Sequence, residues 1–178
     1  YNIAIKGTFD DCQKMVKDMF SENSFREKIN MSAVNSINWA RIVCQVVYYF
    51  YSYFQFKNKK ISFSVPTGNF GDVYAGYVAK KMGLPIKKLI VATNENDILQ
   101  KVINSGEYKP SKVKPSLSPS MDVQVSSNFE RLLFDVLNRD DKKVSNLMSN
   151  LISKGSFKLS SEEVNIIKKD FCAEKISD

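Results

Sequence analysis

The sequence predicts an α/β protein in which a parallel sheet is flanked by helices. Three neighbouring segments support this prediction: a β-type apolar run at Ile61–Val65, a helical pattern at Phe70–Met82, and a second β-type run at Lys88–Thr93. The helix stops at Gly83–Pro85, because a glycine followed two residues later by a proline is a good helix stop. Strand, helix and strand occupy about thirty residues, the usual size of a βαβ unit, so the two strands are expected to be parallel.

A strand and two helices are expected before this unit. Asn2–Lys6 is a candidate strand, and Thr8 with Asp11 forms a capping-box pattern for the helix after it. Residues 21–34 are interpreted as a connecting segment, and the long aromatic helix opens at Asn35-Ser36. The first helix places these residues on one face: Cys12, Met15, Val16, Met19 and Phe20.

After the βαβ unit, the pattern becomes mainly helical. A short helix is expected at Asn96–Asn104, and the Pro- and Ser-rich residues 109–127 form a loop. Apolar residues at helical spacing define two further helices, and Ser160 with Glu163 caps a third. The two apolar faces consist of Phe129, Leu132, Leu133, Val136 and Leu137, and of Val144, Leu147, Met148, Leu151 and Ile152.

Composition limits the classes of function. The 178 residues are 43% hydrophobic and 25% charged, which is typical of a soluble globular protein. A net charge of +7 could favour binding to nucleic acid, to a membrane surface or to anionic metabolites. The lysines are spread along the chain and no aromatic-rich basic strand motif occurs, so a solvated surface is expected and a nucleic-acid partner is not.

The residue types that are missing narrow the chemistry further. Histidine is absent, which excludes Ser-His and Cys-His nucleophiles and His-ligated metals within this chain, and no metal site is predicted. Cys12, Cys44 and Cys172 are far apart and odd in number, as expected for buried, reduced thiols in a cytoplasmic protein. The most apolar run, Ile42–Phe56, is too short to span a bilayer, so no membrane association is predicted.

The loop between the first predicted strand and its helix reads Gly-Asn-Phe-Gly-Asp, residues 68–72. It lies at the carboxyl edge of a parallel sheet, where free backbone N–H groups and the helix dipole favour an anion. Gly68 and Gly71 would permit unusual dihedral angles and a close approach to phosphate oxygens. The alternative is that both glycines only form a tight turn. Neither a dinucleotide fingerprint nor a P-loop is present.

A second polar group precedes the aromatic helix. Asn35 and Ser36 stand at its predicted start and Arg41 in its second turn. Helical side chains lean toward the amino terminus, so the arginine fork could reach a phosphate bound there. The alternative is an ordinary helix cap with Arg41 in a surface ion pair.

Four stretches resemble threonine synthase, a family of pyridoxal-phosphate enzymes with the tryptophan-synthase-like fold, known as fold type II. They read IKGTFDDCQKMV, NSINWARIVCQVVYYF, SVPTGNFGDVYAGYVAKKMGLPIKKLIVATNENDIL and, more weakly, SLSPSMDVQVSSNFERLLF. They occur in the family's order and extend over residues 3 to about 137. The resemblance implies that residues 1–30 end the small domain and that 31–178 form part of the large cofactor-binding domain, with a helical segment from about residue 127.

The resemblance also implies two phosphate sites and a reaction. The pyridoxal 5'-phosphate group would be held, chiefly through backbone N–H groups, by Gly68, Asn69, Phe70, Gly71 and Asp72. The phosphate of O-phospho-L-homoserine would be held by Asn35, Ser36 and Arg41. Water and this substrate would give L-threonine and phosphate.

The Schiff-base lysine of the family is not expected in this chain. In the family it lies upstream in a Ser-Phe-Lys-Asp-like motif, and no such motif precedes Asn35. Ser156–Lys158 and Phe56–Asn58 resemble it only superficially. The chain is therefore expected to be inactive without the missing parts of the same enzyme. The alternative interpretation is a non-catalytic phosphate-binding module related to threonine synthase.

Overall fold

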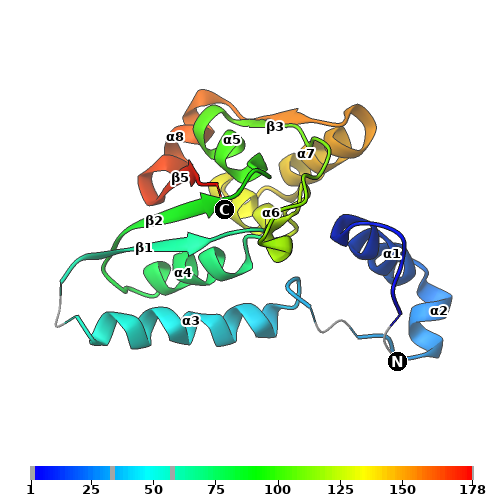
Figure 1. Cartoon of the computed structure of the whole chain (residues 1–178), viewed down its shortest axis with the longest axis horizontal. Coiled ribbons are helices and arrows are strands. Elements are labelled where there is room, and N and C mark those ends of the chain that lie inside the picture. Colours follow the sequence, from blue (N-terminus) through cyan, green and yellow to red (C-terminus); the bar gives the residue numbers. More distant parts are fainter. Residues whose placement is uncertain (1–2, 33–34, 57–58, 178) are drawn as a thin grey trace.

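The computed structural model describes residues 3–32, 35–56 and 59–177. A three-stranded parallel sheet in the order β1-β2-β5 lies at its centre, with helices around it (Figure 1). The elements are α1 (Phe9–Ser21), α2 (Asn23–Lys28), α3 (Trp39–Phe54), β1 (Ile61–Pro66), α4 (Gly71–Lys81), β2 (Ile86–Thr93), α5 (Ile98–Ser105), β3 (Glu107–Tyr108), the 3₁₀ turn η1 (Pro119–Met121), α6 (Phe129–Val136), α7 (Asp141–Lys154), β4 (Phe157–Lys158), α8 (Ser161–Asp170) and β5 (Phe171–Lys175).

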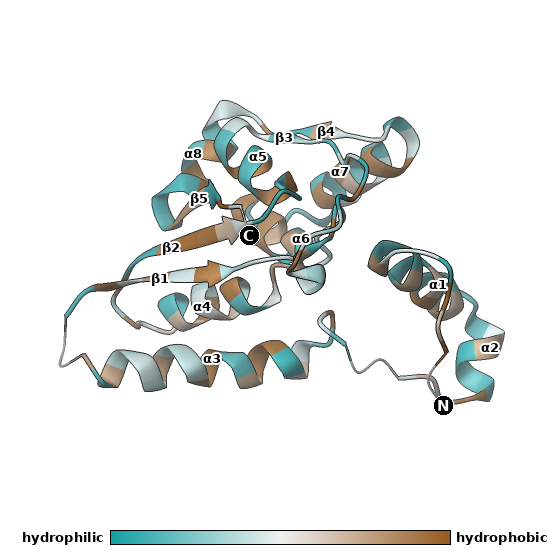
Figure 2. Cartoon of the chain, in the orientation of Figure 1, coloured by the Kyte–Doolittle hydropathy of each residue, from teal (hydrophilic) through white to brown (hydrophobic). Residues whose placement is uncertain are grey.

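The predicted βαβ unit is present as β1, α4 and β2. The two strands pair in parallel, with Val65 opposite Val91, and α4 packs on both. After α4 the chain turns at Gly83, whose φ of +106° suits glycine and ends the helix as predicted. Figure 2 shows β2 as a largely hydrophobic strand in the middle of the sheet, which fits a strand with neighbours on both edges.

The third strand of the sheet was not predicted. β5 pairs in parallel with β2, placing Leu89 opposite Phe171 and Val91 opposite Ala173. It follows α8 directly, because Phe171 is both the cap of that helix and the first residue of the strand. No Gly or Pro separates the two elements, so the sequence contains no signal that the helix ends and a strand begins there. β3 and β4 are two-residue antiparallel strands that are also too short to detect.

The prediction was also wrong in places near the amino terminus. Asn2 lies outside the described residues, and residues 3–6 form no strand, since no described strand pairs with them. The helix α2 occupies part of the predicted connecting segment. In Figure 1, α1 and α2 stand to one side of the sheet and its helices. The capping box of Thr8 and Asp11 is confirmed.

The aromatic helix α3 begins at Trp39, later than predicted. Its N-cap is Asn38, whose side-chain oxygen accepts a hydrogen bond from the N–H of Ala40 at 2.9 Å. Asn35 and Ser36 instead belong to a turn before the helix, in which Asn38 donates its N–H to the Asn35 carbonyl at 3.0 Å. Two asparagines three residues apart could each have capped the helix, and the later one does.

A close contact joins α3 to α4 and the sheet. The buried face of α3 repeats at helical spacing through Ile42, Val46, Tyr49 and Tyr53. Opposite this face lies Gly76 of α4, where a Cβ atom would be only 2.5 Å from the Tyr49 ring. The absence of a side chain at residue 76 therefore allows the two helices to pack this closely.

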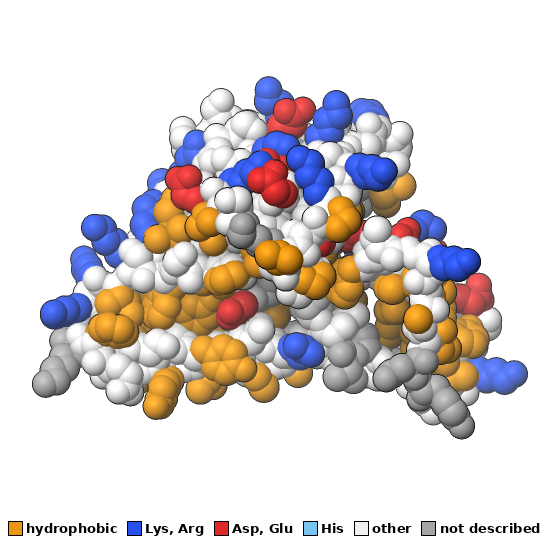
Figure 3. Space-filling view, viewed as in Figure 1, with side chains coloured by type: hydrophobic (Ala, Val, Ile, Leu, Met, Phe, Trp, Pro, Cys, Tyr) orange, Lys and Arg blue, Asp and Glu red, His pale blue; other side chains and the backbone are white. Residues whose placement is uncertain are grey.

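The outer face of α3 and one edge of the sheet are uncovered in the described chain. Val47, Tyr48, Tyr51 and Phe54 are each at least 60% exposed, and Figure 3 shows hydrophobic side chains gathered along this part of the molecule. β1 is an edge strand. The described helices include none with the length and apolarity needed to cross a bilayer. The exposed apolar stripe is unusual for the free surface of a soluble monomer.

The exposure of the α7 face and of two cysteines differs from the prediction. The predicted face of α6 is buried, but on α7 the predicted face is only partly buried and Ile152 is 87% exposed. Cys12 and Cys44 are exposed and Cys172 is half-buried, so the prediction of buried thiols was wrong for the first two. Their helices α1 and α3 each turn a broad apolar face outward, and Cys44 lies beside the exposed Val47 on that face.

Candidate anion-binding site

A cavity of about 150 Å³ lies between the loop after β1 and the beginning of α3. It brings together seven of the eight residues predicted to bind phosphate: Ser36, Arg41, Gly68, Asn69, Phe70, Gly71 and Asp72. The eighth, Asn35, does not line the cavity, because its side-chain oxygen accepts the backbone N–H of Ile37 at 3.1 Å and so shapes the turn. The two predicted anion groups, about thirty residues apart in sequence, thus meet in one place.

The helix α4 starts at this cavity with its first turn uncapped. Among the described residues, no side chain hydrogen-bonds to its amino-terminal N–H groups, and the first helical bond runs from the N–H of Tyr74 to the carbonyl of Phe70 at 3.0 Å. Gly71, Asp72 and Val73 line the cavity, and their N–H groups precede this first helical bond. Uncapped N–H groups and the positive end of the helix dipole together favour an anion.

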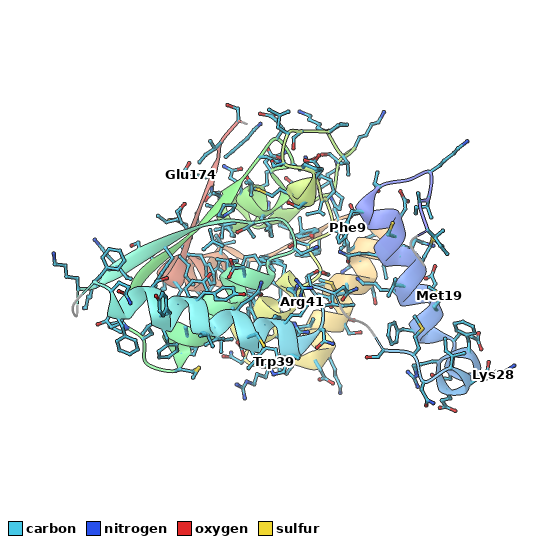
Figure 4. The ribbon with its side chains drawn as sticks, turned by 60° about the horizontal axis from the view of Figure 1, so that its bottom comes forward. Phe9, Met19, Lys28, Trp39, Arg41 and Glu174 are labelled. Atoms are coloured by element: carbon cyan, nitrogen blue, oxygen red, sulfur yellow. The ribbon has the colours of Figure 1, made fainter. Side chains whose placement is uncertain are left out.

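Arg41 contributes the positive charge of the cavity. It lies in the first turn of α3, near the amino-terminal end of the helix in Figure 4. Within the described part of the chain, its guanidinium has no hydrogen-bond or ion-pair partner, so the alternative of a surface ion pair does not hold there. An unpaired guanidinium beside an uncapped helix is suited to a phosphate group.

Comparison with known proteins identifies the family. No family model matches the chain. Threonine synthase from Pseudomonas aeruginosa is 49% identical over 100% of this chain, and threonine synthase from Saccharomyces cerevisiae is 50% identical over 98% of it. The chain belongs to the threonine synthase family. It spans 38% and 37%, respectively, of the lengths of these two proteins.

Solved structures agree with this assignment. A threonine synthase from Brucella melitensis with bound PLP superimposes with a TM-score of 0.87 at 50% identity, over 98% of this chain and 38% of that one. The yeast threonine synthase gives a TM-score of 0.83 at 47% identity, over 98% of this chain and 37% of that one. The predicted fold class and the resemblance to threonine synthase are confirmed.

Within the loop between β1 and α4, the left-handed backbone is at Phe70, not at a glycine. Phe70 has a φ of +64°, whereas neither Gly68 nor Gly71 has a positive φ. A left-handed conformation costs a bulky residue about 1–3 kcal/mol and persists only where the surroundings fix it. Here the Phe70 ring is 1% exposed and packs between Phe129 and Phe171, with ring centroids 5.3 and 5.6 Å away.

The two glycines of the loop have different surroundings. A Cβ atom at Gly68 would lie 2.9 Å from the Ser120 carbonyl oxygen and 3.2 Å from the Met121 Cα. At Gly71 the nearest atom would be 3.4 Å away, an ordinary contact. The close backbone approach predicted for both glycines therefore occurs only at Gly68, where the loop before α6 covers residues 68–72.

Buried amide and carboxylate groups hold that covering loop. Asp122 accepts hydrogen bonds from the Asn94 and Asn96 side chains at 2.8 and 2.9 Å and from the Ser116 hydroxyl at 2.6 Å. This network was not predicted from the sequence. The sequence signal that could have indicated it is the pair of asparagines directly after β2, at the same sheet edge as residues 68–72.

Asn69 and Gln45 extend the set of site residues. The Asn69 side-chain oxygen accepts hydrogen bonds from Gln13 of α1 at 3.1 Å and from the Ser127 hydroxyl at 3.4 Å. It therefore links α1 to the segment before α6. Gln45 also lines the cavity, and its position four residues after Arg41 on one helix face could have indicated this. Nothing in the sequence marks Gln13.

Asp72 faces α3. The Tyr49 hydroxyl donates to the Asp72 backbone carbonyl at 2.8 Å and lies 3.3 Å from its carboxylate. Burial raises the pKa of the Asp72 carboxyl, although the hydrogen bond from Tyr49 opposes this. Burial, followed by the charge of Asp72, raises the pKa of Tyr49. The tyrosine is therefore a neutral donor that anchors the first turn of α4.

The described residues contain no group of three or more acidic or cysteine side chains placed to hold a metal.

Proposed function

We propose that this chain is part of a threonine synthase that converts O-phospho-L-homoserine and water to L-threonine and phosphate with pyridoxal 5'-phosphate. The observation that carries the proposal is the single cavity in which the unpaired Arg41 meets the uncapped start of α4. Support comes from the threonine synthases at about 50% identity and from the PLP bound by the Brucella relative. Because the chain spans little more than a third of these relatives, the activity is proposed for the whole enzyme.

In this proposal the cofactor phosphate is held by the backbone of Gly68, Asn69, Phe70, Gly71 and Asp72. The substrate phosphate is held by Ser36 and Arg41, with Asn35 shaping the turn that presents them. The pyridine ring of the cofactor supplies an electron sink when bound, and this chain supplies positioning. The catalytic lysine lies outside this chain, the domain boundary falls near residue 30, and the enzyme is cytoplasmic.

The function is tested by measuring phosphate release and L-threonine formation from O-phospho-L-homoserine, using the complete enzyme with and without pyridoxal 5'-phosphate. We expect equal amounts of both products and no turnover without the cofactor. This chain alone should give none. If the complete enzyme bound phosphate esters without forming L-threonine, the non-catalytic module would be the better description.

The two loop glycines should respond differently to the same substitution. In the complete enzyme, Gly68→Ala should weaken pyridoxal 5'-phosphate binding about ten-fold or more, because its Cβ would displace the Ser120 carbonyl that covers the loop. Gly71→Ala is the comparison and should weaken binding less, since its Cβ would come no closer than 3.4 Å to any neighbouring atom, the nearest being the Asn128 side-chain nitrogen. Titration of the cofactor-free enzyme measures both affinities. Equal affinities in the two variants would contradict this account of the loop.

A further inference from the structure

One fully buried side chain bridges the two predicted phosphate sites. Asn128, directly before α6, is 0% exposed. Its side-chain nitrogen donates to the Ser36 carbonyl at 2.9 Å and to the Asn69 carbonyl at 3.1 Å. Its backbone N–H also donates to the Asn69 carbonyl, at 3.1 Å. One amide group thus contacts both the turn before α3 and the loop before α4, more than fifty residues away in the sequence.

Arg131 fixes the orientation of this amide. Its Nε donates to the Asn128 side-chain oxygen at 3.0 Å, so the side-chain nitrogen must point to the two carbonyls. The same guanidinium donates from Nη2 to the Ile37 carbonyl at 2.8 Å and lies 5.5 Å from the centre of the Trp39 ring. Asn128 therefore touches both sites, whereas Arg131 adds contacts only to the turn and the start of α3.

We propose that Asn128 is a positioning residue that sets the distance and orientation between the substrate-phosphate site and the cofactor-phosphate site. This inference rests on the proposed function. Asn128 and Arg131 do not line the cavity. Asn128 therefore acts through the backbone of Ser36 and Asn69, and Arg131 supports only the substrate-phosphate site. The reacting groups must be held in a near-attack geometry, and small displacements of a binding group lower the rate strongly.

Replacement by aspartate tests the donors specifically. Asn128→Asp keeps the size and shape of the side chain and still accepts from Arg131. Neither orientation of an ionised carboxylate can donate, and one oxygen would face the Ser36 and Asn69 carbonyls at about the distances of the present hydrogen bonds. The Ser36 segment should therefore separate from residue 128. The Asn69 segment loses its side-chain bond and is displaced, although the backbone N–H of residue 128 still donates to its carbonyl.

In the complete enzyme we expect Asn128→Asp to raise KM for O-phospho-L-homoserine about ten-fold and to weaken pyridoxal 5'-phosphate binding by a similar factor. The inhibition constant of inorganic phosphate, which probes the substrate site without chemistry, should rise in parallel with KM. Arg131→Lys should raise KM and this inhibition constant while changing cofactor affinity less than two-fold.

Asn104→Asp makes the same chemical change at an exposed asparagine and serves as the control. Asn104 also donates its side-chain amide to a backbone carbonyl, that of Ala173 at 3.2 Å, but it joins α5 to β5 away from the cavity. It should lower the unfolding temperature without altering KM or cofactor affinity. If Asn128→Asp behaved like this control, the residue would be merely structural and the inference wrong. A wild-type enzyme without turnover would instead contradict the proposed function.

Discussion

Arg41→Ala is expected to lower the catalytic efficiency of the complete enzyme on O-phospho-L-homoserine by about ten- to a hundred-fold or more. The guanidinium has no protein partner among the described residues, so its bonding capacity is free for the substrate phosphate. A charge-assisted hydrogen bond contributes roughly 1.5–3 kcal/mol, and a bidentate pair contributes more. Steady-state kinetics with saturating cofactor measure the loss.

Two comparisons make this result specific. Arg41→Lys should recover only part of the activity, because an ammonium group cannot reproduce the planar fork. Arg139→Ala removes an exposed arginine of the same charge whose ion pair is with Asp135, and it should leave the kinetics unchanged. If Arg41→Ala instead released the cofactor while the loaded enzyme turned over normally, Arg41 would belong to the other phosphate.

Gly76→Ala should destabilise the fold by about 2 kcal/mol, since so close a contact places the overpacking near the upper end of its usual range, about 3 kcal/mol, and alanine regains about 1 kcal/mol of helix propensity. The new Cβ would lie 2.5 Å from the Tyr49 ring and 2.8 Å from Leu89. Neither neighbour can retreat easily, because Leu89 is fully buried and the Tyr49 hydroxyl is bonded to Asp72.

The measurement is the thermal unfolding midpoint of the complete enzyme, which should fall by several degrees. Gly71→Ala makes the same chemical change in the same helix, with its nearest neighbour 3.4 Å away and not 2.5 Å, and serves as the control. An unchanged midpoint for Gly76→Ala would show that α3 and α4 can separate without loss, and the packing described above would not hold.

Local signals in the sequence predicted much of the fold. The βαβ unit follows from strand composition and the Gly83–Pro85 stop, and both capping boxes follow from residue types at fixed spacing. The pairing of the Asn35–Arg41 segment with the Gly68–Asp72 loop came from the family resemblance. That the two segments meet in one cavity is visible only in the three-dimensional structure. Each segment had been recognised separately from its polar residues.

The features that were missed depend on contacts that one segment cannot encode. Phe70 adopts a left-handed conformation that local preference would assign to a glycine, and only its burial between two distant rings fixes it. Asn128 looks like an ordinary residue at a helix start, and its two carbonyl partners are recognisable only in three dimensions. The same holds for Gln13 at Asn69.

The packing of β5 has a consequence for the order in which the chain becomes ordered. Phe171 is one of the two rings that enclose Phe70, and it is also the first residue of a strand that joins β2 across about eighty residues. Pairing over such a separation forms late in folding, because the intervening loop must close first. During synthesis the Gly68–Asp72 loop would therefore emerge early but take its final shape only after residue 171 has been added. A ribosome-bound or truncated chain that ends before this strand would carry the complete Gly-Asn-Phe-Gly-Asp motif and still lack the packing that fixes its backbone.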